Sequence, residues 1–216
     1  SDVSTLKAGE TAAITFTLTE SSSNFVFADI DVTGGTLSDF AGSGTDYTAT
    51  FTPDTDSTTN GVIHVDSDKF SDAAGNNNQD GAESNNRVTL TVDTGRPKIE
   101  LSSDVSTLKA GETAAITFTL SESSTNFIES DITFNGGTLS NFSGSGTSYS
   151  ATFTPTADST ADGVIHVAND KFSDAAGNNN QDESDANNTV TLTVDTARPT
   201  IAISSDVSSL KAGETA

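Results

Sequence analysis

Apolar and polar residues alternate along several short stretches of the chain. Residues 14–18, 47–51 and 88–92 each carry an apolar side chain at every second position, with threonine in between. A period of two predicts β-strands that bury one face, and threonine suits the exposed face of a sheet. Turns rich in glycine and asparagine separate these stretches. Because no stretch has the period of an amphipathic helix, the sequence predicts an all-β fold.

In the second half of the chain the alternation predicts seven strands. They cover Lys98–Ser102, Glu112–Glu122, Asp131–Phe134, Thr138–Phe142, Ser148–Thr154, Gly163–Val167 and Thr189–Asp195. About seven short strands separated by frequent turns are typical of an immunoglobulin-like β-sandwich. The chain contains no Cys and no Trp, which excludes the antibody type with its disulfide and core tryptophan.

The same sequence recurs at a fixed distance along the chain. SDVSTLKAGETAAITFTL begins at Ser1 and at Ser103, and SDVSSLKAGETA begins at Ser205, which gives a period of 102 residues. A unit of this length is a complete domain, so the chain is predicted to be part of a tandem array. The predicted units are 1–95 (repeat one, without its first strand), 96–197 (repeat two) and 198–216 (the first strand and loop of a third repeat).

Short linkers join the predicted domains. Asp93–Pro97 and Asp195–Pro199 are five residues each, and proline fixes φ where the next strand starts. Adjacent domains are therefore expected to lie nearly end to end. Segment 198–216 carries a first strand without a domain behind it, whereas repeat one lacks that strand. We expect the segment to dock head to tail on repeat one of a neighbouring molecule; the alternatives are that it folds back on repeat two or is ordered by incidental packing.

The charge balance restricts the possible partners. Asp and Glu number 31 against 9 Lys and Arg, for a formal net charge of −22. Such a field repels phosphate, so nucleic acid and anionic membrane surfaces are poor candidates for partners, and we expect neither nucleic-acid binding nor direct membrane insertion. No apolar run has the length of a membrane span, and no signal peptide opens the chain, so we expect any export signal outside it. Leu, Ile, Val and Phe make up about a fifth of the residues, near the lower limit for a folded chain, which predicts a stabilising ligand.

The acidic residues gather in loops and at strand ends, while the exposed strand positions are mostly threonine. Carboxylates packed together repel unless a cation neutralises them, and Ca²⁺ takes 6–8 oxygen ligands. We therefore predict calcium as the cofactor. The candidate ligands are Glu20, Asp29, Asp72, Asn76, Asn78, Asp80 and Asp93 in repeat one, and Glu122, Asp131, Asp174, Asn178, Asn180, Asp182 and Asp195 in repeat two.

The sharpest candidate is the loop KFSDAAGNNNQD, which occurs unchanged at 69–80 and 171–182. Asn76, Asn78 and Asp80 fall at alternate positions, which can turn three oxygens inward, and Asp72 can close the loop from the other side. The alternative is an Asx-rich loop that satisfies its own backbone. For Asp29 and Asp131 the alternative is a turn or a cap.

The sandwich topology indicates which acids can meet. Asp93 ends the last strand of repeat one and faces the next domain, at the end of repeat two where Glu122, Asp131 and the loop 174–182 are expected. A calcium ion at this junction would fix the angle between the two domains.

These residues resemble bacterial Ig-like repeats of very large secreted adhesins of the repeats-in-toxin type. The resemblance rests on the TLKAGETA-ITFTLSE opening, the GGTLS-F-GSGTSY-ATFTP centre, the KFSDAAGN-N loop and the VDT-x-RP-I linker, and it covers the whole chain. It implies a calcium-stabilised extender on the bacterial surface, exported by type I secretion, that holds an adhesive tip away from the cell. By position it implicates Glu20 and Glu122, the two loops, and Asp93 and Asp195.

The remaining function classes have weaker support. The only histidines, His64 and His166, lie within predicted strands, and no nucleophile and base converge in the sequence, so a catalytic role is not expected. The alternative to an extender is an adhesion module in which each repeat binds a carbohydrate or a protein. The absence of an exposed aromatic cluster in the predicted pattern favours the extender.

Overall fold

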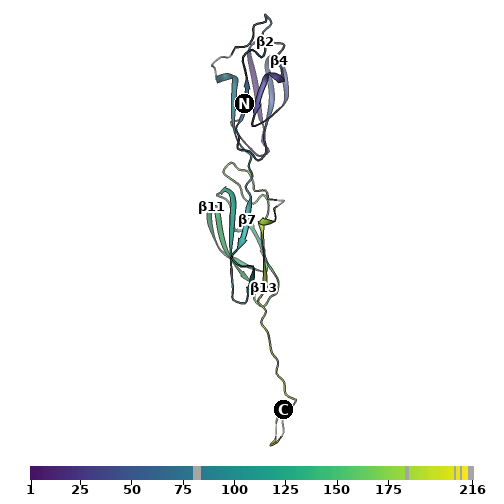
Figure 1. Cartoon of the computed structure of the whole chain (residues 1–216), viewed down its shortest axis with the longest axis vertical. Helices are drawn as coiled ribbons and strands as arrows, with labels where there is room; N and C mark the ends of the chain where they lie inside the picture. The colour runs from purple at the N-terminus through teal and green to yellow at the C-terminus, as the bar shows by residue number, and fades with distance from the viewer. Residues whose placement is uncertain (80–83, 183–184, 207, 210, 214–216) are drawn as a thin grey trace.

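The computed structural model describes residues 1–79, 84–182, 185–206, 208–209 and 211–213. Two β-sandwich domains follow one another along the long axis of the molecule, and the C-terminal segment extends away from the second domain (Figure 1). The fold is all-β and immunoglobulin-like, as the alternating pattern predicted. None of the helices in the described ranges is long and apolar enough to cross a membrane.

Repeat one is built from two sheets. Strands β1, β6, β5 and β3 form one sheet in that order, and β2 pairs with β4 in the other. β1 runs parallel to β6, whereas the other pairs are antiparallel. The strands are β1 (Thr5–Lys7), β2 (Ala12–Ser22), β3 (Ile30–Thr33), β4 (Gly35–Pro53), β5 (Gly61–Val65) and β6 (Arg87–Asp93).

Repeat two has the same two sheets with one strand more. β10, β12, β13 and β8 form the first sheet, and β11, β9 and β7 form the second. The strands are β7 (Ile99–Ser103), β8 (Thr107–Lys109), β9 (Ala114–Ser124), β10 (Ile132–Asn135), β11 (Gly137–Pro155), β12 (Gly163–Val167) and β13 (Thr189–Asp195). Short 3-10 turns cover Phe27–Asp29, Ser84–Asn86, Glu129–Asp131 and Ala186–Asn188.

Two expectations about the strands were wrong. Thr138–Phe142 and Ser148–Thr154 are not separate strands but parts of β11, whose halves lie so close that a Cβ on Gly137 would meet the Thr154 carbonyl at 2.3 Å. Gly144, with φ of 146°, lets the backbone pass the turn without interrupting the element. The sequence analysis also missed β8, because a three-residue strand is too short to show an alternation.

An aromatic cluster fills the core of each repeat. In repeat two the Phe127 ring lies 5.1–5.7 Å from the rings of Phe118, Phe142, Tyr149 and Phe172. The Tyr149 hydroxyl donates a hydrogen bond to the Ser124 carbonyl at 2.8 Å, which satisfies its buried polar atom. Repeat one has the matching cluster around Phe25.

The extra strand β7 covers one edge of the repeat-two core. It pairs antiparallel with β9, with Ile99 opposite Leu120 and Leu101 opposite Phe118. Ile99 and Leu101 are 1% and 6% exposed. In repeat one β2 pairs only with β4 among the described strands.

Candidate metal centre at the junction of the repeats

Three carboxylates converge where repeat one meets repeat two. Asp93 is the last residue of β6, Glu122 lies near the end of β9, and Asp174 belongs to the long loop after β12. Each side chain offers a carboxylate oxygen within 4.8 Å of the other two. The cluster therefore joins two domains, because Asp93 comes from one and the other acids come from the next.

The close approach of the three carboxylates disfavours the negative charge of Glu122. Burial raises the pKa of Glu122, and the negative charges of Asp174 and Asp93 raise it further. Asp93 Oδ1 is buried and accepts no hydrogen bond from the described residues. A buried acceptor without a partner is costly, so this oxygen is available to a cation. Gly95 leaves room beside it, since a Cβ there would lie 3.3 Å from Glu122 Oε1.

Asn178 connects the acidic cluster to both domains. Its Oδ1 accepts a hydrogen bond from Ala8 N of repeat one at 2.7 Å. Its Nδ2 donates to the Asp93 carbonyl at 3.0 Å and to Asp174 Oδ2 at 2.8 Å. Lys7 Nζ also donates to the Gly177 carbonyl, at 3.4 Å. The tip of the loop is thus clasped between β1 and the end of β6.

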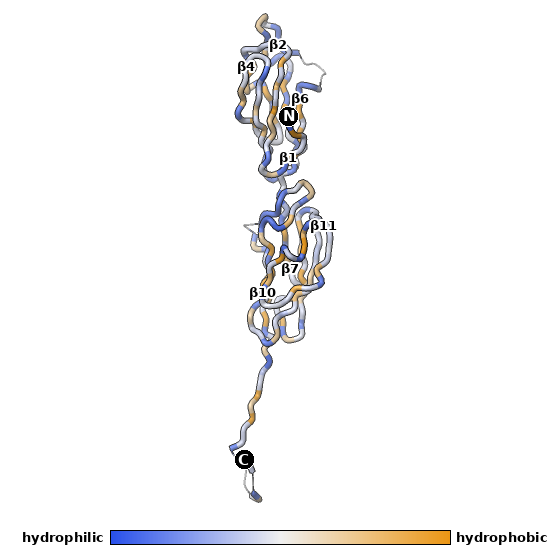
Figure 2. Tube along the Cα trace, turned by 180° about the vertical axis from the view of Figure 1, so that it is seen from behind, coloured by the Kyte–Doolittle hydropathy of each residue, from blue (hydrophilic) through white to orange (hydrophobic). Residues whose placement is uncertain are grey.

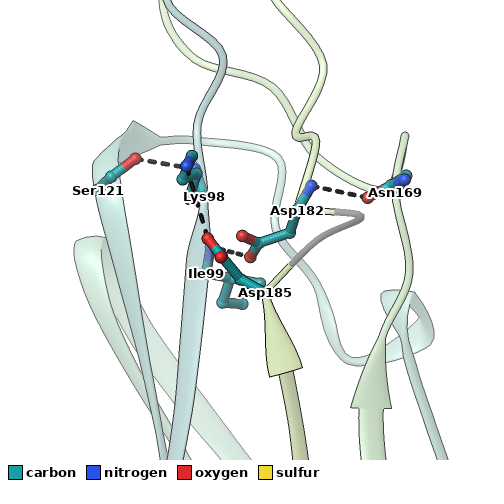
Figure 3. A network of polar contacts seen from close by, with 6 residues as sticks. All are labelled: Lys98, Ile99, Ser121, Asn169, Asp182 and Asp185. Atoms are coloured by element: carbon teal, nitrogen blue, oxygen red, sulfur yellow. Dashed lines mark hydrogen bonds and ion pairs between the residues drawn. The ribbon is translucent and has the colours of Figure 1, made fainter. Parts of the chain in front are cut away.

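Asp182 holds the linker on repeat two from the other end of the loop (Figure 3). Its Oδ2 accepts a hydrogen bond from Ile99 N at 2.7 Å, and its own amide donates to Asn169 at 2.9 Å. Beside it, Lys98 forms an ion pair with Asp185 at 3.5 Å. Asp182 is 3% exposed and its Oδ1 accepts no hydrogen bond from the described part of the chain.

Two of the asparagines that the sequence offered as ligands, Asn78 and Asn180, use their side-chain oxygens within the loops. Asn180 Oδ1 accepts hydrogen bonds from Lys171 N and Phe172 N at 2.7 and 3.0 Å, and Asn78 Oδ1 does the same with Lys69 N and Phe70 N at 2.8 and 3.0 Å. These contacts match the alternative of an Asx-rich loop that satisfies its own backbone.

The other predicted ligands lie apart from the cluster. Asp29 and Asp131 each accept a hydrogen bond from the backbone at the start of a 3-10 turn, at 2.8 and 2.9 Å. Asp195 ends β13 exposed, at the far end of repeat two. Asp80 lies outside the described residues.

In repeat one, Glu20 and Asp72 line one pocket with Asn76–Asn78. Hydrogen bonds from the Asn76 side chain and backbone lower the pKa of Asp72. This pair occupies the positions that Glu122 and Asp174 hold in repeat two, without an acid from a preceding linker among the described residues.

The sequence analysis missed two features. The contacts of Lys7 and Ala8 with the next repeat had no signal, because Lys7 ends a three-residue strand that no alternation marks and Ala8 lies in the turn after it. The second feature is a group in repeat one, where Asp31, His64 and Asp66 offer atoms within 4.8 Å of one another. His64 lies opposite Asp31 in the β3–β5 register, and its Nε2 is 3.0 Å from Asp66 Oδ1.

Comparison with known proteins identifies the family. The sequence pattern of the bacterial Ig-like domain matches residues 1–89 and 93–191. The chain belongs to the bacterial Ig-like domain family. One match covers most of each Ig-like domain, and the short gap between the two matches falls within β6. No curated protein matches the sequence of the chain.

Several solved structures resemble these Ig-like domains in fold. FdeC, an Escherichia coli adhesin, is 18% identical over 89% of this chain and 62% of its own length, with a TM-score of 0.42. Invasin, a bacterial integrin-binding protein, is 14% identical over 88% of this chain and 38% of its own length, with a TM-score of 0.39. The Yersinia pseudotuberculosis adhesin InvE is 13% identical over 88% of this chain and 56% of its own, with a TM-score of 0.31. The chain thus spans less than two thirds of each.

Proposed function

We propose that Ca²⁺ binds between Asp93, Glu122 and Asp174 and locks the two Ig-like domains end to end. The observation that carries this proposal is the convergence of three carboxylates from both sides of the junction, one of them with a buried oxygen that accepts no hydrogen bond from the residues that the structure describes. Such a cluster is repulsive by itself and becomes a cross-link once a divalent cation neutralises it.

The donor set fits calcium better than other cations. The cluster contains only carboxylates, without the imidazole or thiolate ligands that favour zinc and copper. Three carboxylates supply up to six oxygens when bidentate, and water or backbone carbonyls can complete a shell of 6–8. Magnesium demands a stricter octahedral geometry at shorter distances, which acids from three separate elements are less suited to provide.

Side chains around the cluster hold the proposed ligands and the linker in place. Asn178 holds the Asp93 carbonyl and the Asp174 carboxylate in place, and Asp182 fixes the first residue of β7. The cation would add charge neutralisation to this frame. We infer that the array serves as a stiff extender of a surface adhesin, located outside the bacterial cell and exported by type I secretion, rather than as an enzyme.

Calorimetric titration of the chelated chain with Ca²⁺ tests this function. Wild-type protein should bind calcium with a heat signal that Glu122→Gln abolishes, because the variant removes one ligand charge at the junction. Glu20→Gln is the matched control, since Glu20 has the same place in repeat one but no linker acid beside it, and it should retain the junction signal. A wild-type chain that binds no calcium, or equal losses in both variants, would contradict the proposal.

A further inference from the structure

A histidine and two aspartates of repeat one meet on the outer face of a sheet. Asp31 of β3 and His64 of β5 lie directly opposite each other in the antiparallel register, so both project to the same face. Asp66 comes two positions after His64, and the side-chain period of two directs it to that face as well. Hydrophilic and hydrophobic residues alternate along the strands of both repeats (Figure 2). Ile63 and Val65 are 2% and 8% exposed, so they face the core and His64 faces outward.

The three side chains are arranged like the ligands of one metal ion. His64 Nε2 lies 3.0 Å from Asp66 Oδ1, and each of the three residues offers an atom within 4.8 Å of the other two. Bonds of about 2.0–2.1 Å in a tetrahedral zinc shell place neighbouring ligand atoms about 3.3 Å apart. The group therefore needs little rearrangement to close around an ion. The His64 and Asp66 side chains are 23% and 54% exposed, which leaves an entry path from solvent.

The Asp31 carboxylate is not engaged by other groups of the protein. Among the residues that the structure describes, it accepts no hydrogen bond and forms no ion pair. Arg87 lies opposite His64 in the β5–β6 register, but within the described ranges its guanidinium pairs with neither aspartate. The two carboxylates therefore keep their negative charge beside one imidazole.

The corresponding histidine of repeat two has no such neighbours. Thr133 lies opposite His166, and Ala168 stands two positions after it. His166 Nδ1 is instead 2.9 Å from Thr189 Oγ1. Repeat two forms the same strands without the two aspartates, so the fold does not require the group that surrounds His64.

We propose that repeat one binds a zinc ion between Asp31, His64 and Asp66. Zinc accepts imidazole nitrogen and carboxylate oxygen as ligands, and two carboxylates balance its charge. Three protein ligands leave the fourth tetrahedral position to water or to a ligand from another molecule. Calcium takes a shell of oxygens, so this site and the junction of the repeats select different metals. The zinc site uses no residue of the junction and goes beyond the proposed function.

The ion would tie an edge strand to its neighbour. β3 carries Asp31 and lies at the edge of the sheet β1-β6-β5-β3, whereas His64 belongs to β5 and Asp66 follows it. An ion that binds only the folded state shifts the unfolding equilibrium by a factor of 1 + [L]/Kd. Zinc should therefore stabilise repeat one and leave repeat two unchanged.

The imidazole NMR signals of the chain test the site directly. His64 and His166 are the only histidines, so two sets of signals are expected, and His64→Gln assigns them. Excess calcium is kept in the sample because it competes for sites built from oxygens alone. One equivalent of Zn²⁺ should shift or broaden the His64 signals and leave those of His166 in place. Equal changes at both histidines, or no change at His64, would overturn the proposal.

A double variant that copies repeat two separates zinc binding from the fold. Asp31→Thr/Asp66→Ala places the residues of repeat two at both positions. Its zinc affinity should fall by more than about tenfold, since the loss of even an outer partner of a metal ligand costs about 10–100-fold. Asp46→Ser, which copies Ser148 on the other sheet, is the matched control and should keep the wild-type affinity. A double variant that binds zinc as tightly as the wild type would contradict the site.

Hydrogen exchange shows whether the ion holds the edge strand. With zinc at about a hundred times its Kd, exchange in β3 should slow by up to about a hundredfold in the wild-type chain. Neither β10 of repeat two nor β3 of Asp31→Thr/Asp66→Ala should respond. Equal protection of β3 and β10, or protection of β3 in the double variant, would overturn the proposal.

Discussion

The loop KFSDAAGNNNQD has one sequence and two environments in this chain. In repeat two its Asn178 and Asn180 are 2% and 0% exposed, whereas in repeat one Asn76 is exposed and Asn78 is partly exposed. The internal hydrogen bonds are nearly the same in both copies. The two loops differ in what lies on them. In repeat two, Ala8 and the linker from repeat one lie on the loop. A neighbouring domain, and not the loop itself, turns an exposed acidic loop into a buried junction.

The cores show the same dependence on a neighbouring segment. Phe118 is fully buried under β7, while its counterpart Phe16 is partly exposed. Both copies have the aromatic cluster and the tyrosine bond to the β2 or β9 backbone. The repeat as a sequence unit is therefore complete only when a first strand lies on its edge.

Shortening a buried side chain of β7 should have the largest effect on the difference in stability between the two repeats. Leu101→Ala removes a side chain that is 6% exposed, and such changes cost about 2–5 kcal/mol. Ile203→Ala is the matched control in the second copy of the same segment, and it should change the free energy of unfolding by less than about 0.5 kcal/mol. Denaturant unfolding measures both. Equal effects would mean that β7 does not stabilise repeat two.

The two repeats should also differ in local stability within one molecule. Repeat two gains the burial of Ile99 and Leu101, partly offset by the entropy of ordering β7, for a net difference on the order of 3 kcal/mol. Hydrogen exchange followed by mass spectrometry should show slower exchange in β9 than in β2. Equal protection would remove the basis of the comparison.

Loss of the clasp at the junction should have a smaller effect. Asn178→Ala deletes the bonds to Ala8, Asp93 and Asp174, with an expected cost of about 1–2 kcal/mol. Asn76→Ala deletes the hydrogen bond from the Asn76 side chain to Asp72 within its own loop. In limited proteolysis, the linker should be cut faster in Asn178→Ala than in Asn76→Ala. Identical cleavage rates would show that Asn178 does not hold the junction.

Much of the fold followed from the sequence for a simple reason. Strands such as Gly163–Val167 and Thr189–Asp195 have a clear period of two between turn residues, and their bounds agree with the structure. The parallel strands β1 and β8 could not be predicted, because three residues carry no period and their position depends on pairing with β6 and β13. The long β11 was divided in the prediction because glycine is normally a turn signal.

The candidate site was predictable only where topology limits the choice. Strand polarity places Asp93 at one end of repeat one and Glu122 at the facing end of repeat two, so the sequence could pair them. It could not separate Asp174 from Asp131, because both follow strands at loops rich in acids. That distinction depends on the 3-10 turn, where the Asp131 carboxylate accepts a hydrogen bond from the Ile128 amide and is therefore engaged within its own turn.

The most direct test of the account is small-angle scattering of the chain with and without calcium. With calcium bound between Asp93, Glu122 and Asp174, the repeats should give the profile of an extended, rigid pair. Chelation should bring a broader distribution of shorter lengths, and Glu122→Gln should behave like the chelated protein even in excess calcium. Identical profiles in all three conditions would contradict the claim that a cation holds the junction.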